Sequence, residues 1–421
     1  MDFFTIVTIL TVLAAGFGYI NVRFLKLPVT IGLMTVSILF SIAIFIIGYF
    51  EPEVVELEAE LVGQIDFQKV LMEGMLSFLL FAGALHVDFG LLRKQSLPII
   101  MFATIGVLIS AFLVGGMMYA VFSLLGLTIP FIFCLLFGSL ISPTDPIAVL
   151  GILKKAGVPH KLETKIVGES LFNDGIGVVI FATIYSIARA GMDEIAWGEI
   201  GLLFVEEVGG GIALGLVLGF IAYQMMTRID NYEVEVLITL AIVMGGYALA
   251  MYLHFSGPLA MVVAGLMVGH ERFRTSTMSE VTETYIDKFW ELIDNILNAF
   301  LFVLIGLEIV LLSFDGRYLL AGLIAIPVVL LARYAALALP IALFNKKLEF
   351  VPGTSTVMTW CCLCCGISIA LALSLAANMP RDLILTVTYV VVVFSIIVQG
   401  LTVGKLAERF IGKKAPIQPE A

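Results

Sequence analysis

A short run of polar residues interrupts an apolar stretch at residues 163–189. In a helix, Ser170 and Asp174 share a face because they are four residues apart. Glu169 and Asn173 have the same spacing, so one turn presents hydroxyl, amide and carboxylate oxygens together. Oxygen atoms replace the water shell of a monovalent cation when several of them surround it. The residue types and their spacing therefore predict a site for such a cation.

A second acid, Asp145, stands between two prolines in the apolar segment 129–153. Pro143 and Pro146 cannot both lie in an unbroken helix, because proline lacks the backbone donor and clashes with the preceding turn. The backbone carbonyls near Thr144 are therefore expected to be free of helical hydrogen bonds. Such backbone persists at membrane depth only when protein buries it or when it lines a watery cavity. We expect it to face the polar helix and to complete the cation site.

Helix adhesion is the alternative explanation for these polar residues. Side chains such as Ser170 and Asn173 can hydrogen-bond across transmembrane helices, and for either of them alone this alternative stays open. Asp145 and Asp174 are poorly suited to holding helices together. A charged side chain at the bilayer centre costs roughly 2.5–3.5 kcal/mol and needs a partner or a function.

Arg333 is the one cation that we place inside a predicted membrane span; Lys165 and Arg189, at the two ends of the span 163–189, are counted with the loops. A guanidinium without a counter-charge would be prohibitive in that position. We expect Arg333 to form a supporting ion pair with a buried acid, and Glu169 is the candidate partner.

The composition indicates that the chain is a membrane protein. The chain has 421 residues, of which 61% are hydrophobic and 13% charged, whereas soluble domains are about half apolar and a quarter charged. The excess of acids over bases argues against a nucleic-acid partner. With about 20 apolar residues needed for a helical span, the sequence predicts an all-α, polytopic membrane protein with about thirteen spans. They are residues 3–21, 28–49, 70–90, 97–124, 129–153, 163–189, 200–227, 234–253, 257–270, 290–313, 318–344, 354–377 and 383–404.

The loop charges predict an orientation in the membrane. With the N-terminus outside, 18 of the 23 Lys and Arg residues fall in cytoplasmic loops and 4 fall in outside loops. Cytoplasmic loops carry the excess of positive charge in membrane proteins. We therefore expect a multi-pass protein of the plasma (inner) membrane with its C-terminus in the cytoplasm.

Two predicted spans are interrupted at comparable places in the two halves of the chain. The fifth contains the prolines around Asp145, and the twelfth is interrupted at residues 360–366. Discontinuous helices in corresponding positions of inverted repeats indicate a transport site near the bilayer midplane. The sequence therefore predicts inverted repeats with two discontinuous helices.

These motifs are similar to those of a known family, the NhaP-like sodium/proton antiporters of the monovalent cation/proton antiporter-1 family. The resemblance rests on Ser142-Pro143-Thr144-Asp145-Pro146, on Glu169-Ser170-Leu171-Phe172-Asn173-Asp174-Gly175, on Phe302-Val303-Leu304-Ile305-Gly306-Leu307-Glu308 and on Arg333. It covers nearly the whole chain.

The resemblance implies an NhaA-like fold and a homodimer. It implies a single transporter domain over residues 1–421, in which an ion-binding core moves against a dimerisation part. We place the core at about 70–190 and 290–377, and the dimerisation part at about 1–49 and 200–270.

The resemblance also implies roles for the polar residues. Asp174, Ser170, Asp145 and the backbone around Thr144 would coordinate the cation. Asn173 would hydrogen-bond towards Thr144. Relatives with Asn-Asp at this place look electroneutral and exchange one proton for one cation.

Competition at one carboxylate would couple the two ions. Burial disfavours the charged form of an aspartate, so a proton or a cation neutralises Asp174, but not both together. We expect Na⁺ or Li⁺ and H⁺ as substrates, with no cofactor and no enzymatic activity. The alternatives are a K⁺/H⁺ exchanger with the same site and, more remotely, an intramembrane aspartyl protease that uses Asp145 and Asp174.

One stretch departs from the family. The usual Trp-Gly-Gly-Leu-Arg-Gly is here Trp360-Cys361-Cys362-Leu363-Cys364-Cys365. The glycines that would ease a break in the helix are absent, as is the arginine. The cysteines are interpreted as small packing residues, with soft-metal binding and redox sensing as alternatives.

Replacing Asp174 with Asn is expected to abolish cation-dependent proton movement in proteoliposomes without preventing folding. An amide neither titrates nor offers a charged oxygen, so the competition is lost. Exchange that persists in Asp174→Asn protein would contradict the assignment of this carboxyl group.

Overall fold

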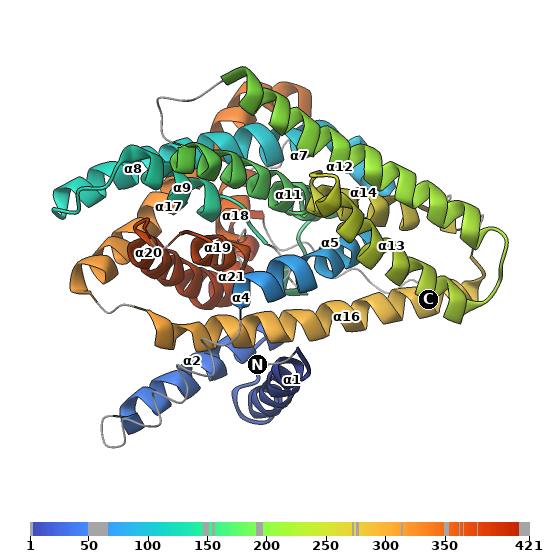
Figure 1. Ribbon diagram of the computed structural model, residues 1–421, viewed down its shortest axis with the longest axis horizontal. Helices are drawn as coiled ribbons and strands as arrows, with labels where there is room; N and C mark the ends of the chain where they lie inside the picture. Colours follow the sequence, from blue (N-terminus) through green and yellow to red (C-terminus); the bar gives the residue numbers. More distant parts are fainter. Residues whose placement is uncertain are drawn as a thin grey trace.

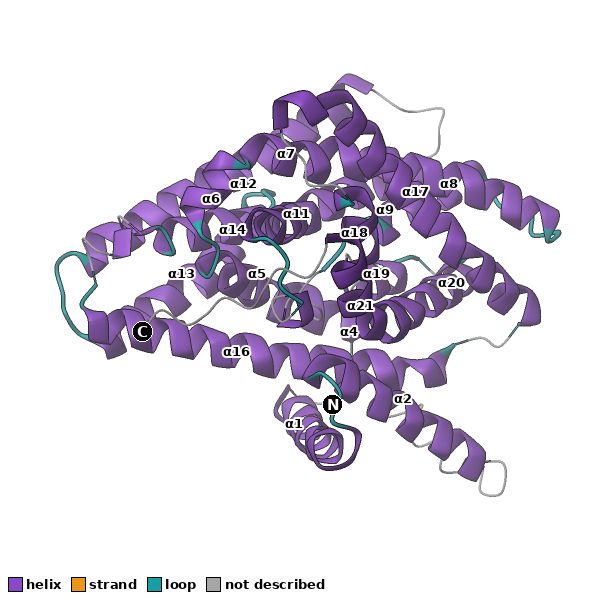
Figure 2. Cartoon of the chain, turned by 180° about the vertical axis from the view of Figure 1, so that it is seen from behind, coloured by secondary structure: helices purple, strands orange, loops and turns teal. Residues whose placement is uncertain are grey.

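The structure is a computed structural model, and it is helical throughout the part that it describes. The described residues are 3–48, 66–145, 151–153, 156–190, 197–271, 273–274, 278–312, 315–348, 353–361, 363–364, 366–376 and 378–411. Within these ranges the only extended pairing is an isolated antiparallel bridge between Asp145 and Leu363. Figures 1 and 2 show the helices from opposite sides.

Long apolar helices account for most of the predicted spans. They are α1 (Phe3–Ile20), α2 (Val29–Gly48), α5 (Leu76–Leu85), α8 (Val107–Leu124), α11 (His160–Ala190), α12 (Trp197–Met226), α13 (Tyr232–Tyr252), α16 (Glu280–Leu307), α17 (Gly316–Leu348) and α20 (Arg381–Phe394). Shorter helices precede or follow some of them: α4 (Phe67–Lys69), α6 (Phe89–Lys94), α7 (Ser96–Met101) and α21 (Gly400–Ile411). Turns of π-helix join several of these into one span: η2 (Val70–Met75), η3 (Phe102–Gly106) and η6 (Ser395–Gln399).

The predicted number of spans agrees with this arrangement. In the described part of the chain, 10 helices are long and apolar enough to cross a membrane. The three remaining predicted spans, the fifth, ninth and twelfth, correspond to shorter helices. These are α9 (Phe131–Ile141), α14 (Gly257–Val268), and the pair α18 (Thr354–Cys361) and α19 (Gly366–Leu373).

Two interrupted helices meet in the middle of the molecule. Helix α9 ends at Ile141, just before Pro143, and the chain between α18 and α19 is interrupted around Leu363. The backbone N–H of Asp145 donates to the carbonyl of Leu363 at 2.8 Å. This bond joins the non-helical segments of the predicted fifth and twelfth spans, which lie more than two hundred residues apart.

The remaining helices surround this crossing. Helix α11 packs against α9, and α17 packs against α8 and α20. Helix α16 runs along one edge of the molecule in Figure 1, where α1 and α2 pack against it. Helix α5 packs between α14 and α16. These contacts do not test the predicted division into a core and a dimerisation part, which stays a prediction.

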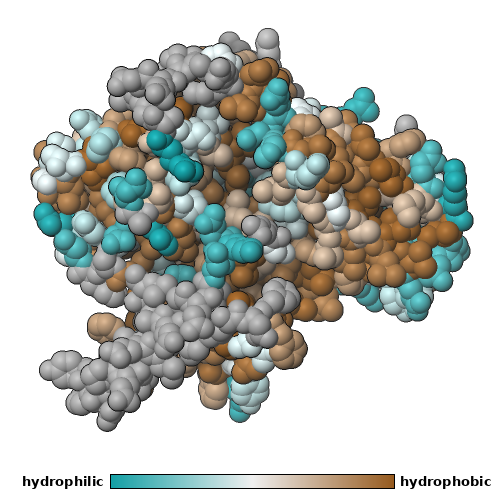
Figure 3. All heavy atoms as spheres, in the orientation of Figure 1, coloured by the Kyte–Doolittle hydropathy of each residue, from teal (hydrophilic) through white to brown (hydrophobic). Residues whose placement is uncertain are grey.

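The outer surface is strongly apolar. Hydrophobic residues cover much of the right-hand part of the view in Figure 3, and hydrophilic residues gather at its outer edge. On α12, Leu202, Val205 and Phe220 are all more than half exposed. Exposed apolar surface on this scale is unusual in soluble monomers. It is what a protein surrounded by lipid requires.

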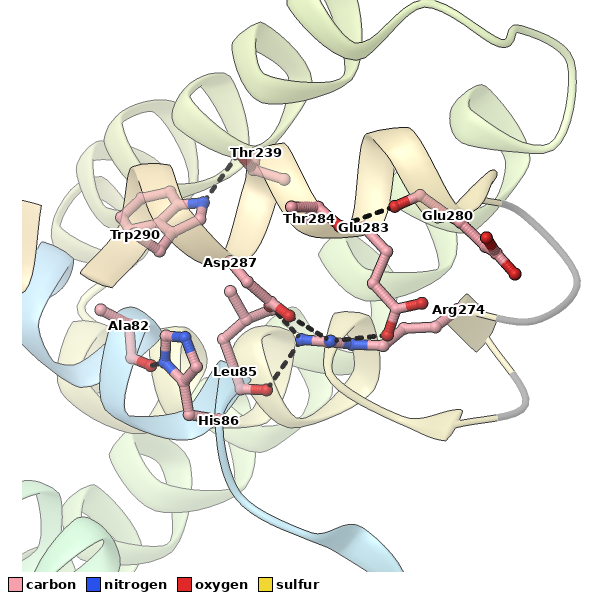
Figure 4. A network of polar contacts seen from close by, with 10 residues as sticks. All are labelled: Ala82, Leu85, His86, Thr239, Arg274, Glu280, Glu283, Thr284, Asp287 and Trp290. Carbon is pink, nitrogen blue, oxygen red and sulfur yellow. Dashed lines mark hydrogen bonds and ion pairs between the residues drawn. The ribbon is translucent and has the colours of Figure 1, made fainter. Parts of the chain in front are cut away.

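Partly buried Arg274 is the centre of a network of polar contacts (Figure 4). Arg274 donates to both carboxylate oxygens of Asp287, at 2.7 and 2.9 Å, and to Glu283 at 3.0 Å. It also donates to the carbonyl of Leu85 at the end of α5. Burial lowers the pKa of the Arg274 guanidinium, but these hydrogen bonds outweigh burial and raise it. Arg274 therefore stays charged and ties α5 to the start of α16.

Close helix contacts depend on glycine. Helices α8 and α9 pack so tightly that a Cβ atom on Gly138 would lie 2.1 Å from the backbone oxygen of Ala111. For Gly116, on α8, no atom of the described residues lies within 4 Å of such a position.

Gly138→Ala is therefore expected to destabilise the protein by about 1–3 kcal/mol, as overpacking of a tight interior does. Gly116→Ala is the matched control and should be neutral. Thermal unfolding of the two purified variants in detergent measures the difference. Equal transition temperatures would contradict this account of the contact between α8 and α9.

Candidate cation site

Helix α11 carries the polar turn that the sequence predicts. The helix has an acid in its first turn, Glu163, and a base in its last, Arg189, and both charges suit the helix dipole. Asp174 is 8% exposed. The other three predicted residues on this turn, Glu169, Ser170 and Asn173, are at most 1% exposed. All four polar side chains are thus inside the protein and not in lipid.

The structure brings Asn173 to the break after α9. Its Nδ2 donates to the Thr144 hydroxyl at 3.0 Å, and its Oδ1 accepts from the Thr144 backbone N–H at 3.3 Å. The amide therefore satisfies a backbone donor and a side-chain oxygen that the interrupted helix leaves behind. Unsatisfied backbone groups cost several kcal/mol each in a membrane. Asn173 fixes the non-helical segment against α11.

The structure also brings Glu169 and Arg333 together. Arg333, on α17, forms an ion pair with Glu169, and both side chains are almost fully buried. The same guanidinium nitrogen lies 3.5 Å from the Thr144 hydroxyl. The pair neutralises two charges in the interior and joins α17 to α11 beside the break.

A cavity lies on one side of the crossing. Asp145, Ser170 and Asp174 line it, and most of its remaining wall is apolar, including residues 76, 79 and 80 of α5. Ser170 Oγ and Asp174 Oδ1 are buried and have no hydrogen-bond partner among the described residues. Buried polar atoms nearly always have a partner. Oxygen atoms left in this state around a cavity are suited to hold a cation.

Thr144 is placed differently from Asp145. Its side chain lines a second cavity together with Arg333, Ser142 and Cys364. Successive residues of extended chain point to opposite sides, so the break presents Asp145 to one cavity and the Thr144 hydroxyl to the other. The five predicted ligand residues gather at one crossing, but the Thr144 side chain holds Asn173 and does not line the first cavity.

Sequence reasoning missed a fourth polar residue on the wall of the first cavity. Asn298, on α16, lines it, is 3% exposed, and has an Oδ1 atom with no hydrogen-bond partner in the described chain. The sequence feature that could have identified Asn298 is its position: an amide inside the predicted span 290–313, one turn after Asp294.

Sequence reasoning also missed two polar residues that hydrogen-bond to backbone groups at the second break. Ser395 Oγ accepts from the backbone N–H of Cys364 at 3.1 Å, and Gln399 Nε2 donates to the carbonyl of Trp360 at 3.2 Å. Both side chains come from the π-helical turn η6. Cys361 and Cys364 are buried, whereas Cys362 and Cys365 lie outside the described residues.

The fold and the site together define a polytopic membrane protein in which two discontinuous helices cross beside buried acids, the architecture of secondary transporters. The profile described as "Sodium/hydrogen exchanger, transmembrane" matches residues 9–409. The chain belongs to this family.

Individual relatives are similar in sequence to this chain over almost its full length. The chain is 50% identical to the Na(+)/H(+) antiporter NhaP of Pseudomonas aeruginosa over 396 residues, which cover 93% of each protein. It is 34% identical to the Na(+)/H(+) antiporter NhaH of Halobacillus dabanensis, over 96% of this chain and 97% of that one. The family consists of transporters, so the comparisons do not favour the protease alternative.

A solved structure shares the fold. The sodium proton antiporter MjNhaP1 from Methanocaldococcus jannaschii at pH 8 matches with a TM-score of 0.73 and 21% identity, over 97% of this chain and 98% of that one. This likeness confirms the predicted all-α, multi-span fold.

Glu169→Gln should destabilise the protein by about 3–5 kcal/mol, because it leaves the buried Arg333 charge without its carboxylate. The double variant Glu169→Gln with Arg333→Gln removes both charges and should recover much of the loss. Thermal unfolding in detergent compares them, with Glu280→Gln, on an exposed position of α16, as the control. A Glu169→Gln protein as stable as Glu280→Gln would contradict a structural role for the pair.

Proposed function

We propose that this protein exchanges Na⁺ or Li⁺ for H⁺ across the plasma membrane by alternating access. The observation that carries the proposal is the cavity lined by Asp145, Ser170 and Asp174, where Ser170 Oγ and Asp174 Oδ1 are buried and have no hydrogen-bond partner within the described part of the chain. The names of the relatives, which are Na⁺/H⁺ antiporters, support Na⁺ and H⁺.

Asp174 is the coupling carboxyl group in this proposal. It lies within the cavity and is at the same time almost completely buried, so its charged form needs a counter-ion. In one direction of transport, a bound cation is the counter-ion of the charged Asp174. In the other direction, a proton neutralises Asp174, and no counter-ion is needed. Asp145 and the Ser170 hydroxyl provide further oxygen ligands beside it. The backbone around Thr144 is proposed to complete the set.

The neighbouring residues keep the exchange one-for-one. Asn173 does not titrate and is engaged with Thr144. The charge of Glu169 is balanced by Arg333. With these groups fixed, a single carboxyl group changes partners in each cycle, and the neutralised site can cross between the two faces while the bare anion cannot.

We propose that the protein is a homodimer, with its N-terminus outside and its C-terminus in the cytoplasm. The loop charges support this orientation. The dimerisation part is proposed to include about residues 1–49 and 200–270, where α1 and α12 expose apolar side chains. The core, which moves against it, includes about residues 70–190 and 290–377.

A fluorescence-dequenching assay in proteoliposomes tests the function. With an imposed proton gradient, Na⁺ and Li⁺ are expected to collapse the gradient at concentrations at which K⁺ does not. Protein with Asp174→Asn, reconstituted at the same density, is the control. A response to K⁺ as strong as that to Na⁺ would favour the K⁺/H⁺ alternative, and no response to any cation would reject the proposal.

The same liposomes test the stoichiometry. One-for-one exchange moves no net charge, so an imposed membrane potential of either sign should leave the initial rate unchanged. A potential of 100 mV acts on each net charge moved with about 2.3 kcal/mol, which would change an electrogenic rate visibly. A clear dependence on potential would contradict electroneutrality and leave the choice of ions standing.

A further inference from the structure

The first cavity is bounded by more than one polar helix. Asp145 follows α9, and Ser170 and Asp174 belong to α11, whereas Asn298 comes from α16 on another wall. Three buried oxygens around this one cavity lack hydrogen-bond partners among the described residues: Ser170 Oγ, Asp174 Oδ1 and Asn298 Oδ1.

The amide of Asn298 is held in one orientation. Its Nδ2 donates to the backbone carbonyl of Asp294 at 2.9 Å and to the Asp294 carboxylate at 3.0 Å. Both acceptors require the nitrogen, so the oxygen is the atom left without a partner. An amide that was present only for packing would have no reason to bury its acceptor unsatisfied beside two acids.

We propose that Asn298 is a further ligand of the transported cation and that Asp294 positions it. The inference rests on the proposed function, because it adds a neutral oxygen to the same site. Asn298 Oδ1 carries no formal charge and does not titrate, so it strengthens cation binding without adding a proton to the exchange. Asp294 acts through Asn298, by holding its nitrogen.

The location of Asn298 makes the site depend on how the helices are arranged. The acids and the serine belong to the α9–α11 region, and the amide belongs to α16. A cation held by both sets of oxygens would bridge α11 and α16. Any relative shift of these two helices removes one oxygen from the cation and weakens its binding.

Transport kinetics test the ligand role. Asn298→Ala should raise the KM for Na⁺ about tenfold, equivalent to about 1.4 kcal/mol, and change the maximal rate much less. Asn295→Ala is the matched control, since Asn295 is an exposed asparagine on the same helix. An unchanged KM in Asn298→Ala, or an equal rise in Asn295→Ala, would overturn the proposal.

The choice between ions gives a second readout. A smaller ion takes fewer oxygen ligands, as Mg²⁺ does relative to Ca²⁺, so losing one oxygen should raise the KM for Na⁺ more than that for Li⁺. An equal rise of the KM for both ions would support Asn298 as a ligand and would contradict its expected effect on the choice between Na⁺ and Li⁺.

Two variants of Asp294 test its positioning role. Asp294→Asn keeps a side-chain oxygen that accepts from Asn298 and should retain a KM near that of the original protein. Asp294→Ala removes the carboxylate acceptor and leaves only the backbone carbonyl of residue 294 to hold the Asn298 nitrogen, so it should raise the KM for Na⁺ by less than Asn298→Ala does. Two Asp294 variants with the same KM would overturn the positioning role.

Binding can be measured without transport. A ligand that binds the folded protein raises its unfolding temperature by mass action, so Na⁺ should stabilise the purified protein in detergent, and Asn298→Ala should need about tenfold more Na⁺ for the same shift. If the original protein binds Na⁺ but moves no protons, the proposed function fails while this test still decides the ligand. If Asn298→Ala and the original protein respond to the same Na⁺ concentrations, the ligand assignment fails alone.

Discussion

The hydrogen bonds between Asn173 and Thr144 are the interaction on which the site depends. A helix that stops in the middle of a membrane leaves polar backbone groups without partners, and each of them costs several kcal/mol. Here one amide accepts from the Thr144 backbone and donates to its hydroxyl. The broken segment is then fixed against α11. Its position brings Asp145 to the same cavity as Ser170 and Asp174.

Charge balance decides which groups remain available for transport. Four ionisable side chains lie at the crossing, and Glu169 and Arg333 compensate each other. A buried pair of this kind adds little stability compared with a well-packed apolar core, but losing one partner is strongly destabilising. Asp145 and Asp174 are the two acids that face the cavity. The site thus combines a mutually neutralised ion pair with two acids on the cavity wall.

Backbone groups at the second break bond to side chains from another part of the chain. Polar side chains of η6, Ser395 and Gln399, bond to the backbone of Cys364 and Trp360. The two cysteines of this break that the structure describes, Cys361 and Cys364, are buried as small side chains are. Among the described residues, η6 and Asp145 thus supply partners for backbone groups at this break.

What the sequence alone determined about this protein is local. Apolar runs of membrane length predicted the spans, because the bilayer sets a fixed length for a helix. The prolines around Asp145 predicted the break, and the spacing on α11 placed four polar residues on one turn. Only the tertiary structure decided which side of the break each residue faces, since that follows from packing. It turned the Thr144 hydroxyl away from the first cavity, and it brought Asn298 into the wall of that cavity from a helix more than a hundred residues further along the chain. Contacts between residues so distant have no local pattern, because they exist only once the helices have packed together.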